Sequence, residues 1–161
     1  MPPHMFGVQA RDLHLTTSLG RPITIYRTEL AIEIWDGTRF DGTAGAALWD
    51  SGADFFTVSE WYADRWRINW RAGTEYLGTG GVGGPHAGVL IPLVIRLVRL
   101  RHVAFRVECQ VLLGSDFPRP LLGNLFVRRN FNVETRGERR TYFRLRDPAP
   151  DAVPPARARG G

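Results

Sequence analysis

The chain has 161 residues and a formal net charge of +5, and 43% of its residues are hydrophobic. This length fits one compact domain, and the apolar content rules out wholesale disorder because it suffices to bury a core. No apolar run reaches the roughly 20 residues that a membrane helix needs, and the first residues lack the pattern of a secretory signal. We therefore expect a soluble, cytoplasmic protein with no membrane span.

The charges are unevenly distributed along the chain. Residues 1–95 contain 7 arginines and 10 acidic residues, whereas residues 96–161 contain 14 arginines and 6 acidic residues. A basic half can contact nucleic acid, but these arginines are scattered through apolar segments and do not cluster with exposed aromatic residues. Nucleic-acid binding is therefore the less favoured interpretation. The single cysteine, Cys109, allows neither an internal disulfide nor a cysteine metal site, and we expect no metal and no cofactor.

The first half of the chain shows strand patterns and one short helix. Apolar and polar residues alternate over residues 23–34, which predicts a half-buried strand. A short apolar run over residues 44–49 predicts a strand that is buried on both faces. Ser59 has the character of an N-cap for a short helix within residues 59–66.

Five glycines lie within residues 78–84, between strands that we expect over residues 69–77 and 87–98. This density permits positive φ angles and close backbone approach, which suits a hairpin tip or a phosphate cradle. The phosphate interpretation is weak, because Gly-Lys-Ser/Thr and a following helix are both missing.

The second half predicts a strand over residues 102–113, one or two helical turns over 124–130, and a hairpin of 131–133 with 141–145. Residues 147–161 contain too little apolar bulk to pack, which predicts a disordered tail. Short strands and glycine-rich turns dominate the whole pattern. We therefore expect an all-β domain over residues 21–146, with a barrel-like or sandwich arrangement and one or two short helices, preceded by an N-terminal segment of residues 1–20.

The strongest chemical signal is Asp50-Ser51-Gly52-Ala53, which directly follows the apolar run. A carboxylate at the end of a buried strand is a candidate catalytic group. The tripeptide alone is weak evidence, and the alternative is a strand-end or N-cap aspartate. The order of the motifs strengthens the case for a catalytic Asp50. The glycine-rich segment follows this motif, and Leu121-Leu122-Gly123 then leads into the second predicted helix.

Over roughly residues 24–133, this order resembles the retropepsin-like aspartic proteases, the family of retroviral proteases and their cellular and bacterial relatives. The resemblance implies a small closed barrel-like acid-protease fold in which residues 80–84 form the tip of a flap hairpin. It also implies that Asp50 is the catalytic carboxylate and that each subunit of a homodimer supplies one. Two carboxylates about 3 Å apart share one proton, so one activates a water molecule while the other polarises the scissile carbonyl.

The resemblance assigns supporting roles as well. Ser51, Gly52 and Ala53 would hold the catalytic loop, with Ser51 bonding across the dimer interface. The implied substrate-binding residues are Leu48, Asp54, Phe55, Thr57, Gly80, Gly81, Val82, Pro118, Arg119 and Leu121. These walls predict extended polypeptide substrates with bulky apolar residues at the cleavage site and an acidic or polar residue facing Arg119.

The chain departs from the retroviral pattern at Asn124, where an arginine often pairs with the acid that corresponds to Asp54. Arg128 or Arg129 is the expected substitute. The function that follows is that of an aspartic endopeptidase, and the alternative is a non-catalytic module that binds peptides or dimerises a partner. Because the chain contains a single Asp-Ser/Thr-Gly loop, catalysis would need two copies.

Overall fold

A closed ring of six strands forms the body of the protein in the computed structural model, which describes residues 4–41, 45–50, 52–78, 86–137 and 139–153. The strands pair in the order β10-β7-β11-β6-β4-β9, and β9 pairs again with β10. These strands are β4 (Glu29–Trp35), β6 (Ala46–Asp50), β7 (Phe56–Ser59), β9 (His86–Leu97), β10 (Ala104–Leu112) and β11 (Leu121–Gly123). The predicted all-β, closed barrel-like fold is therefore confirmed.

Three short strands extend the ring. They are β5 (Phe40–Asp41) beside β4, β8 (Thr74–Gly78) beside β9, and β14 (Ala152–Val153) beside β10. β8 and β9 are the antiparallel arms of the hairpin for which a flap is expected. The glycine-rich tip of that hairpin, residues 79–85, lies outside the described residues.

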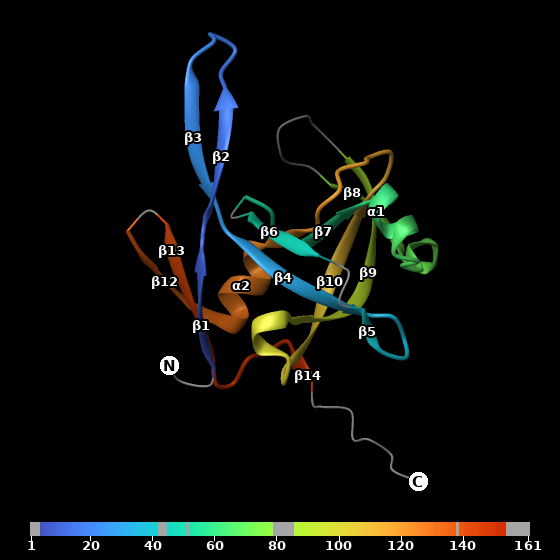
Figure 1. Cartoon of the computed structure of the whole chain (residues 1–161). Coiled ribbons are helices and arrows are strands. Elements are labelled where there is room, and N and C mark those ends of the chain that lie inside the picture. The colour runs from blue at the N-terminus through green and yellow to red at the C-terminus, as the bar shows by residue number, and fades with distance from the viewer. Residues whose placement is uncertain (1–3, 42–44, 51, 79–85, 138, 154–161) are drawn as a thin grey trace.

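A second sheet packs on the side of the ring, in the order β1-β13-β12 (Figure 1). Its strands are β1 (Met5–Gln9), β12 (Phe131–Arg136) and β13 (Arg140–Leu145). Phe6, Phe131 and Phe143 of this sheet are buried, and Phe143 packs edge-on against Trp49 of β6 with 5.6 Å between ring centres. The N-terminal segment that we expected outside the domain thus contributes β1 to the packed structure, because Phe6 enters the core.

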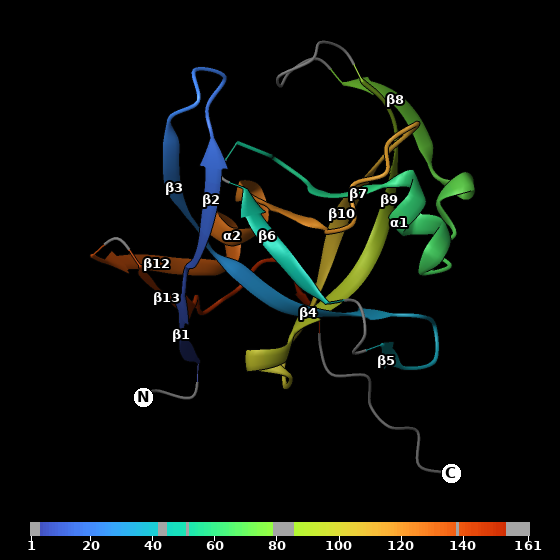
Figure 2. The ribbon, with the colours of Figure 1, turned by 45° about the horizontal axis from the view of Figure 1, so that its top comes forward.

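β2 (Arg11–Thr16) and β3 (Pro22–Arg27) form a two-stranded ribbon that projects from the body (Figures 1 and 2). The single strand expected over residues 23–34 is wrong, because the chain divides at Thr28 into β3 and β4. The Thr28 carbonyl accepts a hydrogen bond from the Trp49 N–H at 2.9 Å. The alternation changes phase at this division, from apolar residues at Ile23 and Ile25 to apolar residues at Leu30 and Ile32, and this phase change was the available signal.

Both predicted helices are present. α1 (Glu60–Arg65) begins after Ser59, whose hydroxyl accepts a hydrogen bond from the Tyr62 N–H at 3.0 Å, as expected of an N-cap. α2 (Asn124–Asn130) follows β11 directly. No helix among the described residues is long and apolar enough to cross a membrane.

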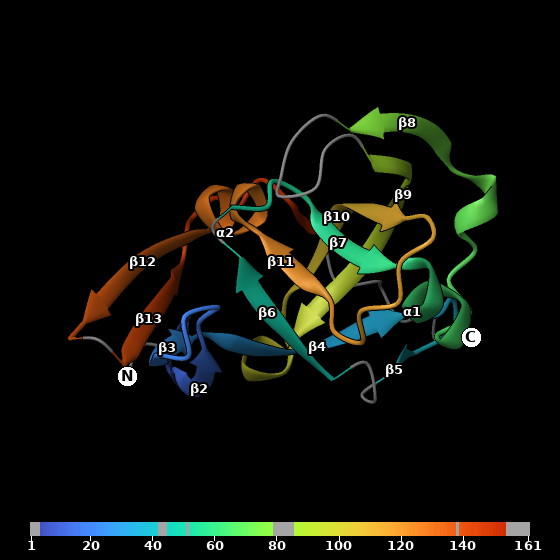
Figure 3. The ribbon, with the colours of Figure 1, turned by 90° about the horizontal axis from the view of Figure 1, so that it is seen from above.

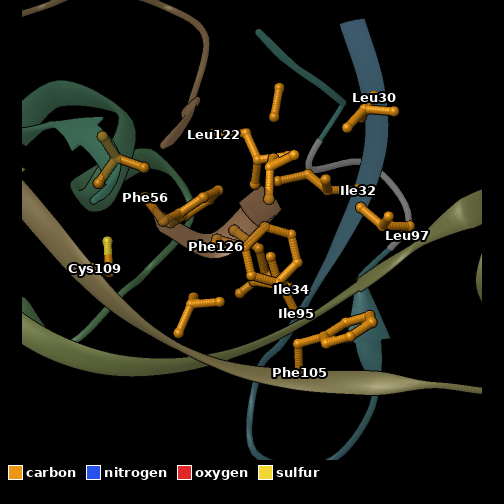
Figure 4. Packing of buried hydrophobic residues seen from close by; sticks show 14 of the residues in the cluster. Leu30, Ile32, Ile34, Phe56, Ile95, Leu97, Phe105, Cys109, Leu122 and Phe126 are labelled. Atoms are coloured by element: carbon orange, nitrogen blue, oxygen red, sulfur yellow. The ribbon is translucent and has the colours of Figure 1, made fainter. Parts of the chain in front are cut away.

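The core lies inside the ring, where apolar side chains of opposing strands meet (Figure 4). Ile32, Ile95 and Phe105 are fully buried there. Cys109 is also fully buried, and burial raises the pKa of its thiol. A thiol held neutral in this way is a core residue and not a nucleophile.

The segment from Asp147 to Val153 differs from the expected disordered tail. Asp151 accepts hydrogen bonds from the Arg129 guanidinium, at 2.9 and 3.2 Å, and from the buried Asn130 amide at 2.6 Å. β14 then pairs with β10. Composition favoured disorder because apolar residues are few, but polar contacts to α2 hold this segment; residues 154–161 lie outside the described residues.

A buried carboxylate ties two strands of the ring together. Glu33 of β4 has a side chain that is 5% exposed, and it accepts hydrogen bonds from Arg96 of β9 and, at 2.9 Å, from Arg101. Burial alone would raise the pKa of Glu33, but the hydrogen bonds and charges of the two arginines outweigh it and hold that pKa below its usual value. The charged carboxylate therefore stabilises the folded ring.

Replacing Glu33 by Gln should lower the free energy of unfolding by about 1 to 3 kcal/mol, because the partly buried Arg96 and the more exposed Arg101 lose their counter-charge. Urea unfolding at neutral pH measures this, and Glu75→Gln on the exposed face of β8 is the control. Since the folded pKa is lowered, the stabilisation is present above the ordinary value of 4.5 and is lost as the pH falls through the folded pKa. A difference between the two proteins that did not shrink in acid would contradict this account.

Candidate functional site

Asp50 is the last residue of β6, which runs parallel to β11 in the ring (Figure 3). In this register Asp50 lies opposite Gly123 and Leu48 opposite Leu121. The Leu48 N–H donates to the Pro120 carbonyl at 2.8 Å, so the strand is fixed on this side as far as its carboxyl end. Asp50 is half-buried.

The residues after Asp50 turn back onto it. The Gly52 N–H donates to the Asp50 carboxylate at 2.9 Å, and the Ala53 N–H donates to the Asp50 carbonyl at 3.2 Å. The first of these bonds fixes the orientation of the carboxylate. The Gly52 and Ala53 N–H groups thus both bond back to Asp50, whereas Ser51 lies outside the described residues.

Gly123 approaches this loop very closely. A Cβ atom built on Gly123 would lie 2.3 Å from the carbonyl oxygens of both Asp54 and Phe55. The next two residues begin α2 and donate their N–H groups to the loop, Asn124 to the Ala53 carbonyl at 2.7 Å and Leu125 to the Asp54 carbonyl at 3.2 Å. The first N–H groups of a helix have no partner within it, so the loop carbonyls satisfy them. The predicted motif Leu121-Leu122-Gly123 therefore lies against the Asp50 loop.

The predicted wall residues fall into separate places. Asp54 and Phe55 line a pocket of about 300 Å³ that also contains Arg129 and Asp151. Thr57 is buried, and its hydroxyl donates to the Phe55 carbonyl at 3.1 Å. The predicted residues Gly80, Gly81 and Val82 lie outside the described residues.

Pro118 and Arg119 line a different pocket, of about 300 Å³, together with Trp61 of α1. Arg119 donates a hydrogen bond to Glu29 at the start of β4, and Glu29 also pairs with Arg11 at 3.3 Å. The Glu29 side chain is only 10% exposed. Sequence reasoning missed Glu29, because no local pattern links it to Arg119, which is 90 residues away.

Arg128 and Arg129 were the expected arginine partners of Asp54, and neither forms an ion pair with it among the described residues. The Arg129 guanidinium binds both oxygens of Asp151, so this arginine is engaged at the C-terminal segment. Arg128 lines another hollow, of about 560 Å³, together with Asn124 and Trp49. Trp49 immediately precedes Asp50 in β6, but the side chains of consecutive strand residues point to opposite faces, and Asp50 is not part of the lining of this hollow.

Trp49 is a residue of this site that the sequence did not single out. Its indole N–H is buried and has no hydrogen-bond partner among the described residues. A buried unpaired donor is costly, so its position beside an open hollow marks an incomplete environment. A tryptophan next to the catalytic motif was the available signal, but core filling explained it equally well.

Comparisons with known proteins identify the fold. No family model and no curated protein matches the chain. Among solved structures, the chain is similar to a retropepsin-like aspartic protease from Rickettsia conorii, with 12% identity, a TM-score of 0.57, and coverage of 88% of this chain and 90% of that chain. The protein therefore has a retropepsin-like fold.

Gly123→Ala should destabilise the loop around Asp50, because the added methyl group meets two backbone carbonyls that cannot move without shifting the loop. We expect a loss of about 1 to 3 kcal/mol in the free energy of unfolding, as is typical of overpacking. Chemical denaturation measures it, and Asn124→Ala, which leaves the backbone contact intact, is the matched control. Equal stability of Gly123→Ala and the wild type would show that the loop does not depend on this close approach.

Proposed function

We propose that the protein is an aspartic endopeptidase that acts as a homodimer, with one Asp50 from each copy. The observation that carries the proposal is the placement of Asp50 at the end of β6, opposite Gly123, with its carboxylate oriented by the Gly52 N–H. The retropepsin-like fold supports the same reaction class, since the protein from Rickettsia conorii is described as an aspartic protease.

The chemistry requires two carboxylates, and the chain supplies one Asp-Ser/Thr-Gly loop. Leu121-Leu122-Gly123 repeats the form of an apolar strand that ends in glycine, but without an aspartate. A second copy would place its Asp50 against the first, and the two carboxylates would share a proton. One then removes a proton from the attacking water while the other hydrogen-bonds to the scissile carbonyl.

The side of the molecule next to Asp50 is suited to a second copy. β12 is an outer strand that pairs only with β13 within the described residues, and its residues from Asn132 to Arg136 are exposed. An unpaired strand edge is a template for pairing with another chain. The hollow beside Trp49 opens between α2 and β12, so a copy paired along β12 would also cover it.

Asp50→Asn should abolish cleavage, because the amide cannot carry the shared proton. We expect a loss of at least about 100-fold in the rate of hydrolysis of an unfolded protein substrate at mildly acidic pH, without loss of folding. Asp116→Asn, at an exposed aspartate of the loop before β11, is the control. Equal cleavage by Asp50→Asn and wild type would refute the assignment; a wild type that binds a statine-type peptide without cleaving any substrate would favour the non-catalytic peptide-binding module.

The predicted subsite at Arg119 has a test of its own. Because Glu29 neutralises part of the Arg119 charge, Glu29→Gln should strengthen selection for an acidic residue at one position of the substrate, by up to about fivefold, the equivalent of roughly 1 kcal/mol. Cleavage profiling of a peptide library measures this, with Glu75→Gln as the control. Profiles that ignore substrate charge in both the wild type and Glu29→Gln would contradict a role of Arg119 in the wall.

A further inference from the structure

The two-stranded ribbon of β2 and β3 has one apolar and one polar face. Pairing places Leu13 opposite Ile25 and Leu15 opposite Ile23, so these four side chains lie on one face of the ribbon. The alternating residues of the other face are Asp12, His14, Thr16, Thr24 and Tyr26, with His14 and Thr24 hydrogen-bonded at 3.0 Å. We call the first set the ribbon apolar face.

This face is open to solvent in the single chain. Leu13, Leu15 and Ile23 are 43%, 40% and 42% exposed, and Leu19 at the turn is 80% exposed. A two-stranded hairpin is at best marginally stable alone, and a contiguous exposed apolar patch marks an interaction surface. The ribbon projects from the body in two views (Figures 1 and 2), in agreement with the exposure of these side chains.

The base of the ribbon is nevertheless fixed next to the candidate site. Arg11 at the start of β2 pairs with Glu29, which holds Arg119 just before β11. On the other side, Arg139 lies 3.7 Å from the Asp12 carboxylate and 5.0 Å from the centre of the Tyr26 ring. The ribbon is thus tied both to the strand pair that carries Asp50 and to the β12–β13 hairpin.

We propose that a second copy of this chain covers the ribbon apolar face, so that each ribbon is an arm of the homodimer. The inference rests on the proposed function, which already requires a second copy at Asp50. The base of the ribbon is close to this residue, since Thr28, which follows β3, bonds to Trp49. Pairing along β12 alone involves 6 residues of each chain. Stable interfaces bury about 20 to 30 residues on each side, so a dimer built on that strand needs a further apolar surface. The ribbon apolar face supplies one. Arg11 projects from the same face as Leu13 and Leu15, and it ties this face to Glu29, which lies opposite Leu48 of β6.

The test uses a thiol-reactive, polarity-sensitive fluorophore on the ribbon of the full chain. Cys109 is fully buried, so Leu15→Cys introduces the one accessible thiol among the described residues. Thr16→Cys is the matched control, because it is the next residue and lies on the polar face. Sedimentation velocity over a dilution series gives the monomer–dimer equilibrium of each labelled protein.

The expected result is that the label at Leu15 shifts to longer emission wavelength on dilution, with the same midpoint as dimer dissociation, while the label at Thr16 does not change. Leu15→Gln should also weaken dimerisation at least about tenfold, and Thr16→Gln should leave it unchanged. A Leu15 label that is indifferent to dimer dissociation overturns the inference. So does a shift that follows an added substrate peptide at constant dimer content, because the occupant is then a polypeptide of another kind.

These outcomes are separable from the fate of the proposed function. If dimers cleave substrate through Asp50 but leave the Leu15 label exposed, the ribbon is not a dimer arm and the proposed endopeptidase function is unaffected. If dimers protect the label but show no Asp50-dependent cleavage, the proposed endopeptidase function is wrong and the role of the ribbon in dimerisation is unaffected. A wild type that stays monomeric at every concentration refutes both.

Discussion

The close approach of Gly123 to the loop after Asp50 is the contact on which the candidate site depends. With no side chain at Gly123, the carbonyls of Asp54 and Phe55 come near enough for α2 to donate its first N–H groups to the loop. The parallel pairing of β6 with β11 brings the two segments together from far apart in the chain. Loop, strand and helix therefore hold one another, and the Asp50 carboxylate has a fixed direction as a result.

Several arginines of this protein are partners of poorly exposed carboxylates. Glu33, Glu29 and Asp151 each accept from guanidinium groups that lie far away in sequence or on a neighbouring element. Each contact joins parts of the fold: β4 to β9, the ribbon base to the loop before β11, and the C-terminal segment to α2. Part of the excess of arginine in the second half of the chain is thus used in internal ion pairs.

The ring of strands is complete, while the candidate site is not. A single carboxylate, an indole N–H without a partner, an unpaired strand edge and an uncovered apolar ribbon all occur around Asp50. A second copy of the chain would add a carboxylate, pair the strand edge and cover the apolar ribbon. The homodimer and its ribbon arms are proposals that share this physical reason, and their experiments separate them.

The sequence by itself determined the class of fold and both helices, because strand alternation and an N-cap serine are local signals. The association of the Asp50 loop with Leu121-Leu122-Gly123 was implied only by the resemblance to a family, and the parallel pairing of β6 with β11 establishes it. The sequence did not predict that the chain divides into two strands at Thr28 or that residues 147–153 are ordered. It also did not identify Glu29 and Trp49. Tertiary structure decided these because each depends on a partner distant in the chain: Trp49 for Thr28, Asn130 for Asp151, and Arg119 for Glu29. Composition reports which residues can be buried, but only the folded chain determines which polar groups they meet.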